Sequence, residues 1–157
     1  MESSVFISLG SLVLGSGLTF GLEVLRHKRT RNDTVQDARR LERSQAYVDF
    51  LNSAHDAAHL LGRSTPGCPN PLDADGAVYW TLDSDVTRRL RVIEIVGAEA
   101  VTGAARMLRA ALDDFRAATT RPGMVYATDE YWHEYSNVAR HRDSFIESAR
   151  HDLRTTS

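Results

Sequence analysis

The feature that most constrains the fold is an uncharged run of twenty residues near the N-terminus, Ser3–Leu22, which reads SSVFISLGSLVLGSGLTFGL. A bilayer core of roughly 30 Å requires about 20 mainly apolar helical residues, so this run is long enough to cross a membrane. A basic cluster follows it, whereas only the α-amine and Glu2 precede it. Because cytoplasmic flanks are enriched in Lys and Arg, we expect residues 1–25 to form a cell-membrane anchor with the N-terminus outside and the rest of the chain cytoplasmic.

Two other interpretations of this run are a cleaved signal peptide and a buried helix of a soluble domain. A signal peptide carries positive charge before its apolar region and a small-residue cleavage site after it, and this chain has the reverse charge order without such a site. A buried helix is usually shorter and polar on one face. We therefore favour a permanent anchor followed by a basic juxtamembrane collar over residues 26–32. The collar residues expected to contact anionic lipid headgroups are Arg26, Lys28, Arg29 and Arg31.

The anchor also contains a stripe of glycines. Gly17 and Gly21 form a GxxxG motif, and Gly10 lies one heptad before Gly17 on the same side of the helix. Small residues allow two membrane helices to approach closely, although GxxxG alone is a weak motif and small residues also occur without any packing role. The expected partners are therefore membrane lipid together with a second copy of this chain or another membrane protein.

The charge balance of the remaining chain argues against a nucleic-acid partner. Residues 32–157 contain 15 Arg and 19 acidic residues, whereas a nucleic-acid surface needs clustered positive charge on the domain itself. The single cysteine, Cys68, excludes an internal disulfide and suits a reducing cytoplasm. After the anchor, the chain is long enough for one domain of modest size.

Residues 33–157 are predicted to be an all-α domain, a small antiparallel bundle of about four helices. The apolar residues recur at three- and four-residue steps, and the expected helices cover about 33–61, 84–97, 101–120 and 128–153. Ser84 or Asp85 is the expected N-cap of the second helix and Thr128 that of the fourth, while Gly62 is expected just after the first. No Pro or Gly lies between residues 22 and 61, so whether the anchor continues unbroken into the first of these helices stays open.

Residues 62–83 are predicted to be an irregular loop, because they contain Pro66, Pro69, Pro71 and three glycines. About 20 residues is long for a loop in a compact domain, and such loops are either functional or loosely ordered. Tyr79 and Trp80 lie in this stretch. We favour their packing back onto the bundle over the alternative of a partner-docking tip.

The candidates for chemistry are few. His55 and His59 are four residues apart and could share a metal ion, and Glu130 and His133 form the Glu-x-x-His element of ferritin-like carboxylate sites. The histidine pair lacks an obvious third ligand, and the Glu-x-x-His element has no second copy. The chain contains no Gly-x-Ser-x-Gly elbow, Walker loop, Gly-x-Gly-x-x-Gly or CxxC motif. We therefore expect no cofactor and an interaction module rather than an enzyme.

Three blocks of the cytoplasmic domain carry a resemblance. They read RSQAYVDF at 43–50, LRVIEIVG at 90–97 followed by VTGAA at 101–105, and FIESARHDL at 145–153. Together with the N-terminal span and the Arg-rich collar, they make the chain resemble a group of small uncharacterised actinobacterial membrane proteins. The resemblance covers most of the chain and implies a single span with a helical cytoplasmic domain. It implies no activity, so no functional residue is carried over.

The sequence thus predicts a membrane-tethered cytoplasmic helical interaction or scaffold module, able to self-associate through its glycine-rich span. Two alternatives remain open. One is a metal-dependent or hydrolytic membrane-anchored enzyme using His55, His59 and His133. The other is a regulatory or immunity-type protein that binds a partner.

Overall fold

A computed structural model of the protein describes residues 35–72 and 76–155. Within these ranges the regular structure is entirely helical, which confirms the predicted all-α class. The helices cover residues 35–64, α2 (Gly76–Val96), α3 (Glu99–Thr119) and α4 (Asp129–Thr155). The chain divides into two compact units, Met1–Arg39 and Arg40–Ser157. Of the first unit the structure describes residues 35–39, which are helical.

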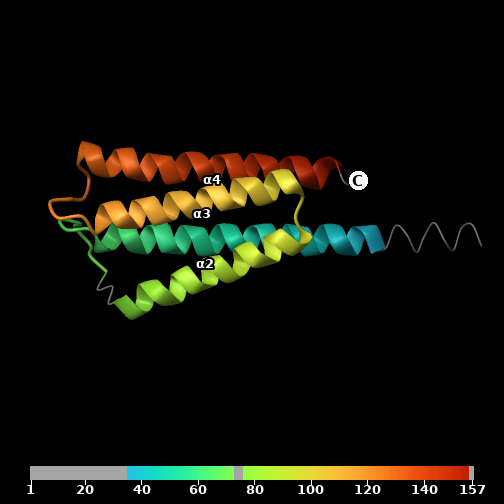
Figure 1. The fold of residues 1–157 in the computed structure, drawn as a ribbon, viewed down its shortest axis with the longest axis horizontal. Helices are drawn as coiled ribbons and strands as arrows, with labels where there is room; N and C mark the ends of the chain where they lie inside the picture. Colours follow the sequence, from blue (N-terminus) through green and yellow to red (C-terminus); the bar gives the residue numbers. More distant parts are fainter. Residues whose placement is uncertain (1–34, 73–75, 156–157) are drawn as a thin grey trace, which may run out of the picture. The chain divides into compact units, whose positions relative to one another are not determined.

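The second unit is a bundle in which each helix runs antiparallel to the one before it (Figure 1). The helix over residues 35–64 packs on α4 through Phe50 and Phe145, whose ring centroids are 5.2 Å apart. It contacts α2 through an ion pair between Asp49 and Arg89 with an N–O distance of 2.6 Å. The α3 helix packs on α4 through Phe115 and Tyr131, with 5.7 Å between their centroids. The four helices therefore enclose one common core.

The core consists of the apolar faces that the residue spacing predicts. Phe50, Phe115 and Phe145 are almost completely buried, and complete burial of a phenylalanine side chain contributes about 1.5–3 kcal/mol. On the 35–64 helix, the buried side chains that recur at three- and four-residue steps are Tyr47, Phe50, Ala54, Ala58 and Leu61. This periodicity is what directs one face of the helix toward its neighbours.

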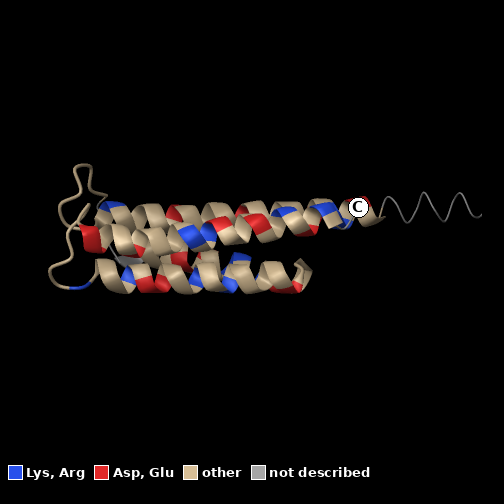
Figure 2. Cartoon of the chain, turned by 90° about the horizontal axis from the view of Figure 1, so that it is seen from above, with Lys and Arg blue, Asp and Glu red and all other residues tan. Residues whose placement is uncertain are grey.

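Charged residues cover the outside of the bundle. Basic and acidic residues alternate along the helices in the view of Figure 2, without collecting by sign. Several form ion pairs between helices, such as that of Arg109 on α3 with Asp83 on α2, at 2.8 Å. These charges therefore cross-link neighbouring helices.

Several helix ends agree with the sequence prediction. The α4 helix begins after Thr128, whose Oγ1 accepts a hydrogen bond from the backbone N–H of Tyr131 at 3.4 Å, as expected of an N-cap. The α2 helix ends at Val96, just before Gly97, and α3 ends at Thr119, before Pro122. These ends depend on capping and on proline, which are properties of the local sequence.

The irregular stretch is shorter than the predicted 62–83, because residues 62–64 and 76–83 are helical. Ser84 and Asp85 accordingly lie inside α2 and are not its N-cap. The reason is tertiary: Tyr79 is buried on the same side of α2 as Val86 and Ile93, so the core stabilises the helix well before Ser84.

The predicted anchor (1–25), the basic collar (26–32) and the Gly10, Gly17 and Gly21 stripe lie outside the described residues. So does the connection between the predicted anchor and the helix over residues 35–64. In the ranges 35–72 and 76–155, no helix has the length and hydropathy needed to cross a bilayer.

Candidate functional site

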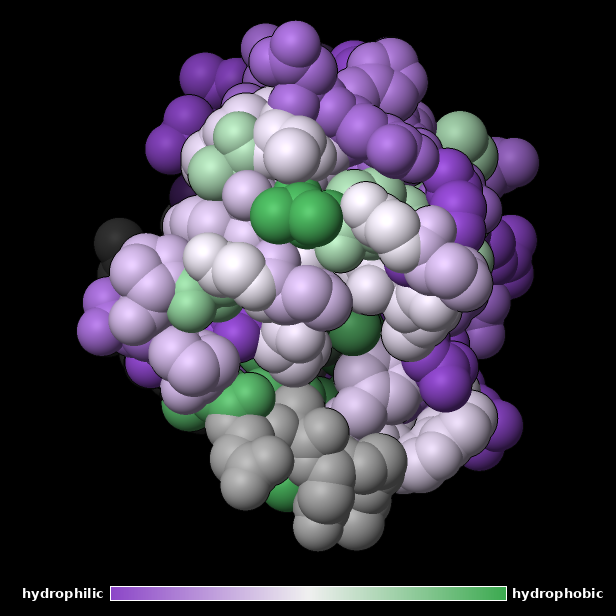
Figure 3. All heavy atoms as spheres, turned by 90° about the vertical axis from the view of Figure 1, so that its left-hand side faces the viewer, coloured by the Kyte–Doolittle hydropathy of each residue, from purple (hydrophilic) through white to green (hydrophobic). Residues whose placement is uncertain are grey.

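An open pocket of about 660 Å³ lies at the end of the bundle where the 35–64 helix ends and α4 begins. This volume falls within the range of ligand-binding pockets, about 300–1,000 Å³. The middle of this end face is mainly weakly polar or apolar, while strongly hydrophilic side chains lie toward its upper and right-hand rim (Figure 3). We refer to this cavity as the end pocket; its two walls come from segments far apart in the sequence.

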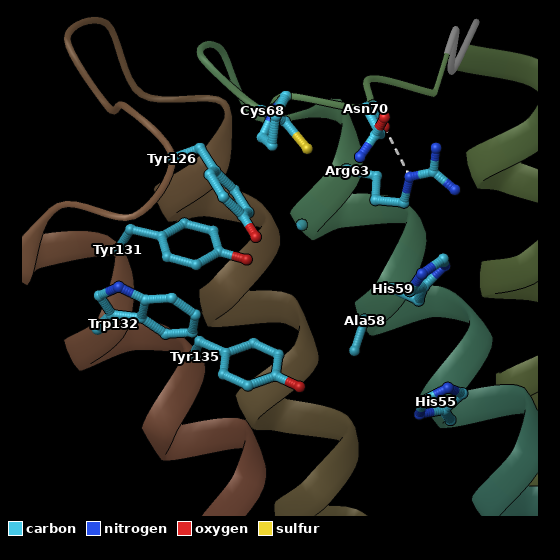
Figure 4. A pocket seen from close by; sticks show the side chains of 12 residues that line it. His55, Ala58, His59, Arg63, Cys68, Asn70, Tyr126, Tyr131, Trp132 and Tyr135 are labelled. Atoms are coloured by element: carbon cyan, nitrogen blue, oxygen red, sulfur yellow. Dashed lines mark hydrogen bonds between the residues drawn. The ribbon is translucent and has the colours of Figure 1, made fainter.

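The first wall is aromatic and comes from α4 and the loop before it. Tyr131 and Tyr135 are one helical turn apart and stack in parallel, with ring centroids 6.2 Å apart and an interplanar angle of 5°. Trp132 lies edge-on to Tyr131 at 5.1 Å, and Tyr126 contributes a fourth ring 4.9 Å from Tyr131. Phe115 of α3 supports the wall from behind. The hydroxyl groups of the three tyrosines point toward the 35–64 helix (Figure 4).

The pocket is hollow where the 35–64 helix carries small residues. Ala58 and Gly62 are buried and line the pocket. A Cβ atom at Gly62 would lie 2.8 Å from the Tyr131 hydroxyl oxygen, which is closer than real Cβ contacts. Glycine at position 62 therefore permits Tyr131 to approach the helix. The helix continues to residue 64, so Gly62 lies inside it and not after its end.

The second wall is a polar row on the 35–64 helix. His55, His59 and Arg63 follow one another at steps of four residues and therefore share one face of the helix. The two imidazole rings stack with centroids 6.1 Å apart. Arg63 Nε donates a hydrogen bond to the backbone oxygen of Asn70 at 2.7 Å, which holds the following loop against the helix (Figure 4). Cys68 lies in the same loop and also lines the pocket.

The two loops at this end are joined to each other. The backbone N–H of Tyr126 donates a hydrogen bond to the Pro66 oxygen at 2.8 Å, and the N–H of Leu72 donates to the Arg63 oxygen at 3.1 Å. The aromatic wall and the polar row are therefore connected through the backbone. Because the two walls are already held together, less conformational entropy is lost when a ligand binds.

The Tyr131 phenol favours its neutral form. Burial, together with the neighbouring Tyr126, Tyr135 and Cys68, raises the pKa of Tyr131 to about 12. At neutral pH the Tyr131 hydroxyl is therefore a hydrogen-bond donor as well as an acceptor. The residues that line the end pocket include no Asp or Glu among those that the structure describes.

The structure separates the metal-site candidates. His55 and His59 lie together in the end pocket, but His133 and Glu130 do not line it. Glu130 instead accepts a hydrogen bond from Arg121 at 2.8 Å. Within the described ranges, no group of three or more His, Cys, Asp or Glu side chains is arranged to hold a metal ion.

Tyr79 and Trp80 are not in a loop, because both lie in the first turns of α2. Tyr79 is buried and its hydroxyl donates a hydrogen bond to Asp83 at 3.1 Å, which agrees with the favoured packing onto the bundle. Trp80 is 54% exposed. The Arg116 guanidinium of α3 lies over both rings, 4.2 Å and 4.5 Å from their centroids, so it attaches the start of α2 to α3.

Sequence reasoning missed the aromatic wall and Arg63 as parts of a site. One signal was present: residues 126–135 contain four aromatic side chains within ten positions, directly at a helix start. Their position opposite a histidine pair some seventy residues earlier depends on the bundle topology, and no local motif encodes it.

No known protein family, curated protein or solved structure matches this chain. Its function is therefore inferred from the chemistry of its own residues.

Proposed function

We propose that this protein is a membrane-anchored binding module whose cytoplasmic helical bundle recognises its ligand at the end pocket. The observation that carries the proposal is the pocket itself, about 660 Å³ between an aromatic wall and a polar row. Trp132 is 47% exposed there, so a large aromatic surface is available to a ligand. Exposed aromatic side chains in a concave site are typical of binding surfaces, because they contribute large contact areas with little loss of side-chain entropy.

Binding fits the pocket better than catalysis. In the described part of the chain, neither His55 nor His59 forms a hydrogen bond with a carboxylate, hydroxyl or thiol group, whereas an activated nucleophile needs an oriented base. The raised pKa of Tyr131 suits hydrogen bonding to a ligand more than proton transfer at neutral pH.

The anchor is the second part of the proposal. The uncharged run Ser3–Leu22 and the collar behind it support insertion with the bundle on the cytoplasmic side. The glycines at 10, 17 and 21 support close association with a second copy or another membrane helix. The resemblance to small actinobacterial single-span proteins is consistent with this arrangement.

Trp132 provides the test of the binding proposal, because the chain contains only two tryptophans. In a Trp80→Phe variant of the full chain, purified in dodecyl maltoside, the fluorescence reports on the end pocket alone. We expect at least one of three aromatic probes, phenyl phosphate, benzyl alcohol or phenyltrimethylammonium, to change the emission saturably. A Trp132→Phe variant that retains Trp80 is the control. If no probe changes Trp132 emission, the end pocket is not a binding site.

The anchor is tested separately by membrane fractionation. We expect the full chain to stay with the membrane after an alkaline carbonate wash, and a protease added to the outside of intact cells to leave the bundle uncut. Release by the wash would refute the anchor. If Gly17→Ile with Gly21→Ile left the association state in detergent unchanged, self-association through the span would be refuted.

A further inference from the structure

We propose that the end pocket binds an organic anion that carries a phosphate or carboxylate group on a planar or apolar body. This inference rests on the proposed binding function and specifies its ligand. The charged group would lie against Arg63, His55 and His59, and the body against the tyrosines and Trp132. Three independent observations support the assignment.

The first observation concerns the interactions of the Arg63 guanidinium group. Six arginines in the described ranges are partly buried: Arg43, Arg63, Arg89, Arg109, Arg116 and Arg142. Four of them pair with a carboxylate, and Arg116 lies over two aromatic rings. Arg63 differs, because among the described residues its guanidinium forms no ion pair and donates through Nε to one backbone oxygen. Arg63 thus carries a positive charge at the edge of the pocket without an internal partner, with its terminal nitrogens turned away from the tyrosines (Figure 4).

The second observation is the set of groups beside that charge. The lining includes two histidines, three phenols and Asn70, all of which can donate a hydrogen bond, and it includes no Asp or Glu within the described residues. When it is ionised, a phosphate or carboxylate group accepts hydrogen bonds and donates none. A site that is rich in hydrogen-bond donors and contains no carboxylate is therefore complementary to such a group. The raised pKa of Tyr131 keeps its hydroxyl protonated and able to donate.

The third observation argues against a cationic ligand. Aromatic walls also bind cations, through the negative faces of their rings. In the end pocket, however, the hydroxyl groups of Tyr126, Tyr131 and Tyr135 point toward the opposite wall (Figure 4). A cation between the walls would also meet Arg63 without a carboxylate to compensate. The geometry therefore favours an anion with an aromatic or apolar body.

The test uses the Trp80→Phe full chain in dodecyl maltoside and four probes of similar size. Phenyl phosphate and benzoate carry the proposed chemistry, phenyltrimethylammonium carries the opposite charge, and benzyl alcohol is neutral. We expect saturable changes of Trp132 emission with the two anions and at least tenfold weaker changes with the other probes. An ionic hydrogen bond contributes on the order of 1.5–3 kcal/mol, which corresponds to about tenfold or more in affinity.

Variants of Arg63 separate charge from structure. Arg63→Gln removes the charge and is expected to weaken phenyl phosphate binding at least tenfold, whereas Arg63→Lys keeps the charge and is expected to retain part of the affinity. Arg91→Ala is the matched control, because Arg91 is exposed on α2, outside the pocket. Equal losses in Arg63→Gln and Arg63→Lys would mean that Arg63 only holds the Asn70 loop, and would overturn its role as the anion ligand.

The outcomes distinguish this inference from the function on which it rests. Binding of phenyltrimethylammonium or benzyl alcohol without the anions would overturn the inference and leave a binding pocket. No response to any probe would overturn both. A further arm places the protein in phosphatidylcholine vesicles with or without phosphatidylglycerol. If the anionic lipid alone changes Trp132 emission and competes with phenyl phosphate, the anion is a lipid headgroup; if it does not, the anion is a soluble metabolite.

Discussion

Substitution of Gly62 by alanine tests the packing on which the end pocket depends. Alanine is favoured over glycine inside a helix by about 1 kcal/mol, so the change would be stabilising if space were available. At Gly62 the new Cβ would lie 2.8 Å from the Tyr131 hydroxyl oxygen. Tyr131 is 3% exposed, and its ring contacts those of Tyr126, Trp132, Tyr135 and Phe115. It therefore cannot move aside without disturbing the whole aromatic wall.

The expected change in the free energy of unfolding follows from two opposing effects, the helix propensity of alanine and the overpacking against Tyr131. Overpacking of a well-packed site costs about 1–3 kcal/mol. After subtraction of the propensity gain, Gly62→Ala is expected to change the free energy of unfolding by about 0 to 2 kcal/mol in the destabilising direction. The matched control is Gly103→Ala on α3, where a Cβ would meet nothing within 4 Å. That substitution is expected to stabilise the bundle by about 1 kcal/mol.

A double-mutant cycle identifies the clash itself. In a Tyr131→Phe background the hydroxyl is absent, and the nearest ring atom, Cζ, would lie 4.0 Å from the new Cβ, an ordinary contact. Gly62→Ala is then expected to stabilise the protein as Gly103→Ala does. The measurement is urea unfolding of the full chain in dodecyl maltoside, followed by far-UV circular dichroism. Equal stabilisation by Gly62→Ala and Gly103→Ala in the wild-type background would refute the proposed packing, and so would a coupling of zero between Gly62 and Tyr131.

Three further predictions concern the rest of the bundle. Tyr47→Phe removes the buried hydrogen bond of 2.7 Å to Asp152 and is expected to cost about 1–3 kcal/mol in urea unfolding; no loss would refute the role of this contact. Burial raises the pKa of Tyr47 and Tyr131 to about 12, above the value near 10 of an exposed phenol. Their protonated forms therefore favour the fold, and this stability should be complete below pH 10 and decrease as the pH rises toward 12. An ultraviolet titration in which every tyrosine ionises near pH 10 in the folded protein would contradict this. Arg116→Ala removes the cation above Trp80 and is expected to change the tryptophan emission of a Trp132→Phe variant, with a loss of about 0.5–1 kcal/mol in stability; an unchanged spectrum would exclude the contact.

Much of the fold could be predicted from the sequence because it depends on local chemistry. The three- and four-residue spacing of Tyr47, Phe50 and Leu61 predicts the buried face of the first helix, and these residues are buried. Thr128 caps α4 because its hydroxyl reaches an N–H three residues later, whatever the helix packs against. The anchor over residues 1–25 is also a conclusion from the sequence alone, and it remains a prediction for the fractionation experiment.

The tertiary structure decided what local chemistry left open. The α2 helix begins at Gly76 because the core buries Tyr79, although Pro, Gly and Asp residues nearby favour a loop. Gly62 resembles a helix stop in the sequence, yet it serves a close approach by Tyr131 from a segment almost seventy residues later. The end pocket likewise combines Arg63 with Tyr126, which only the return of the chain to the same end of the bundle brings together. Helix periodicity and capping act over a few residues, whereas a cavity requires the juxtaposition of distant ones, and this is the physical reason why the site appears only in the folded chain.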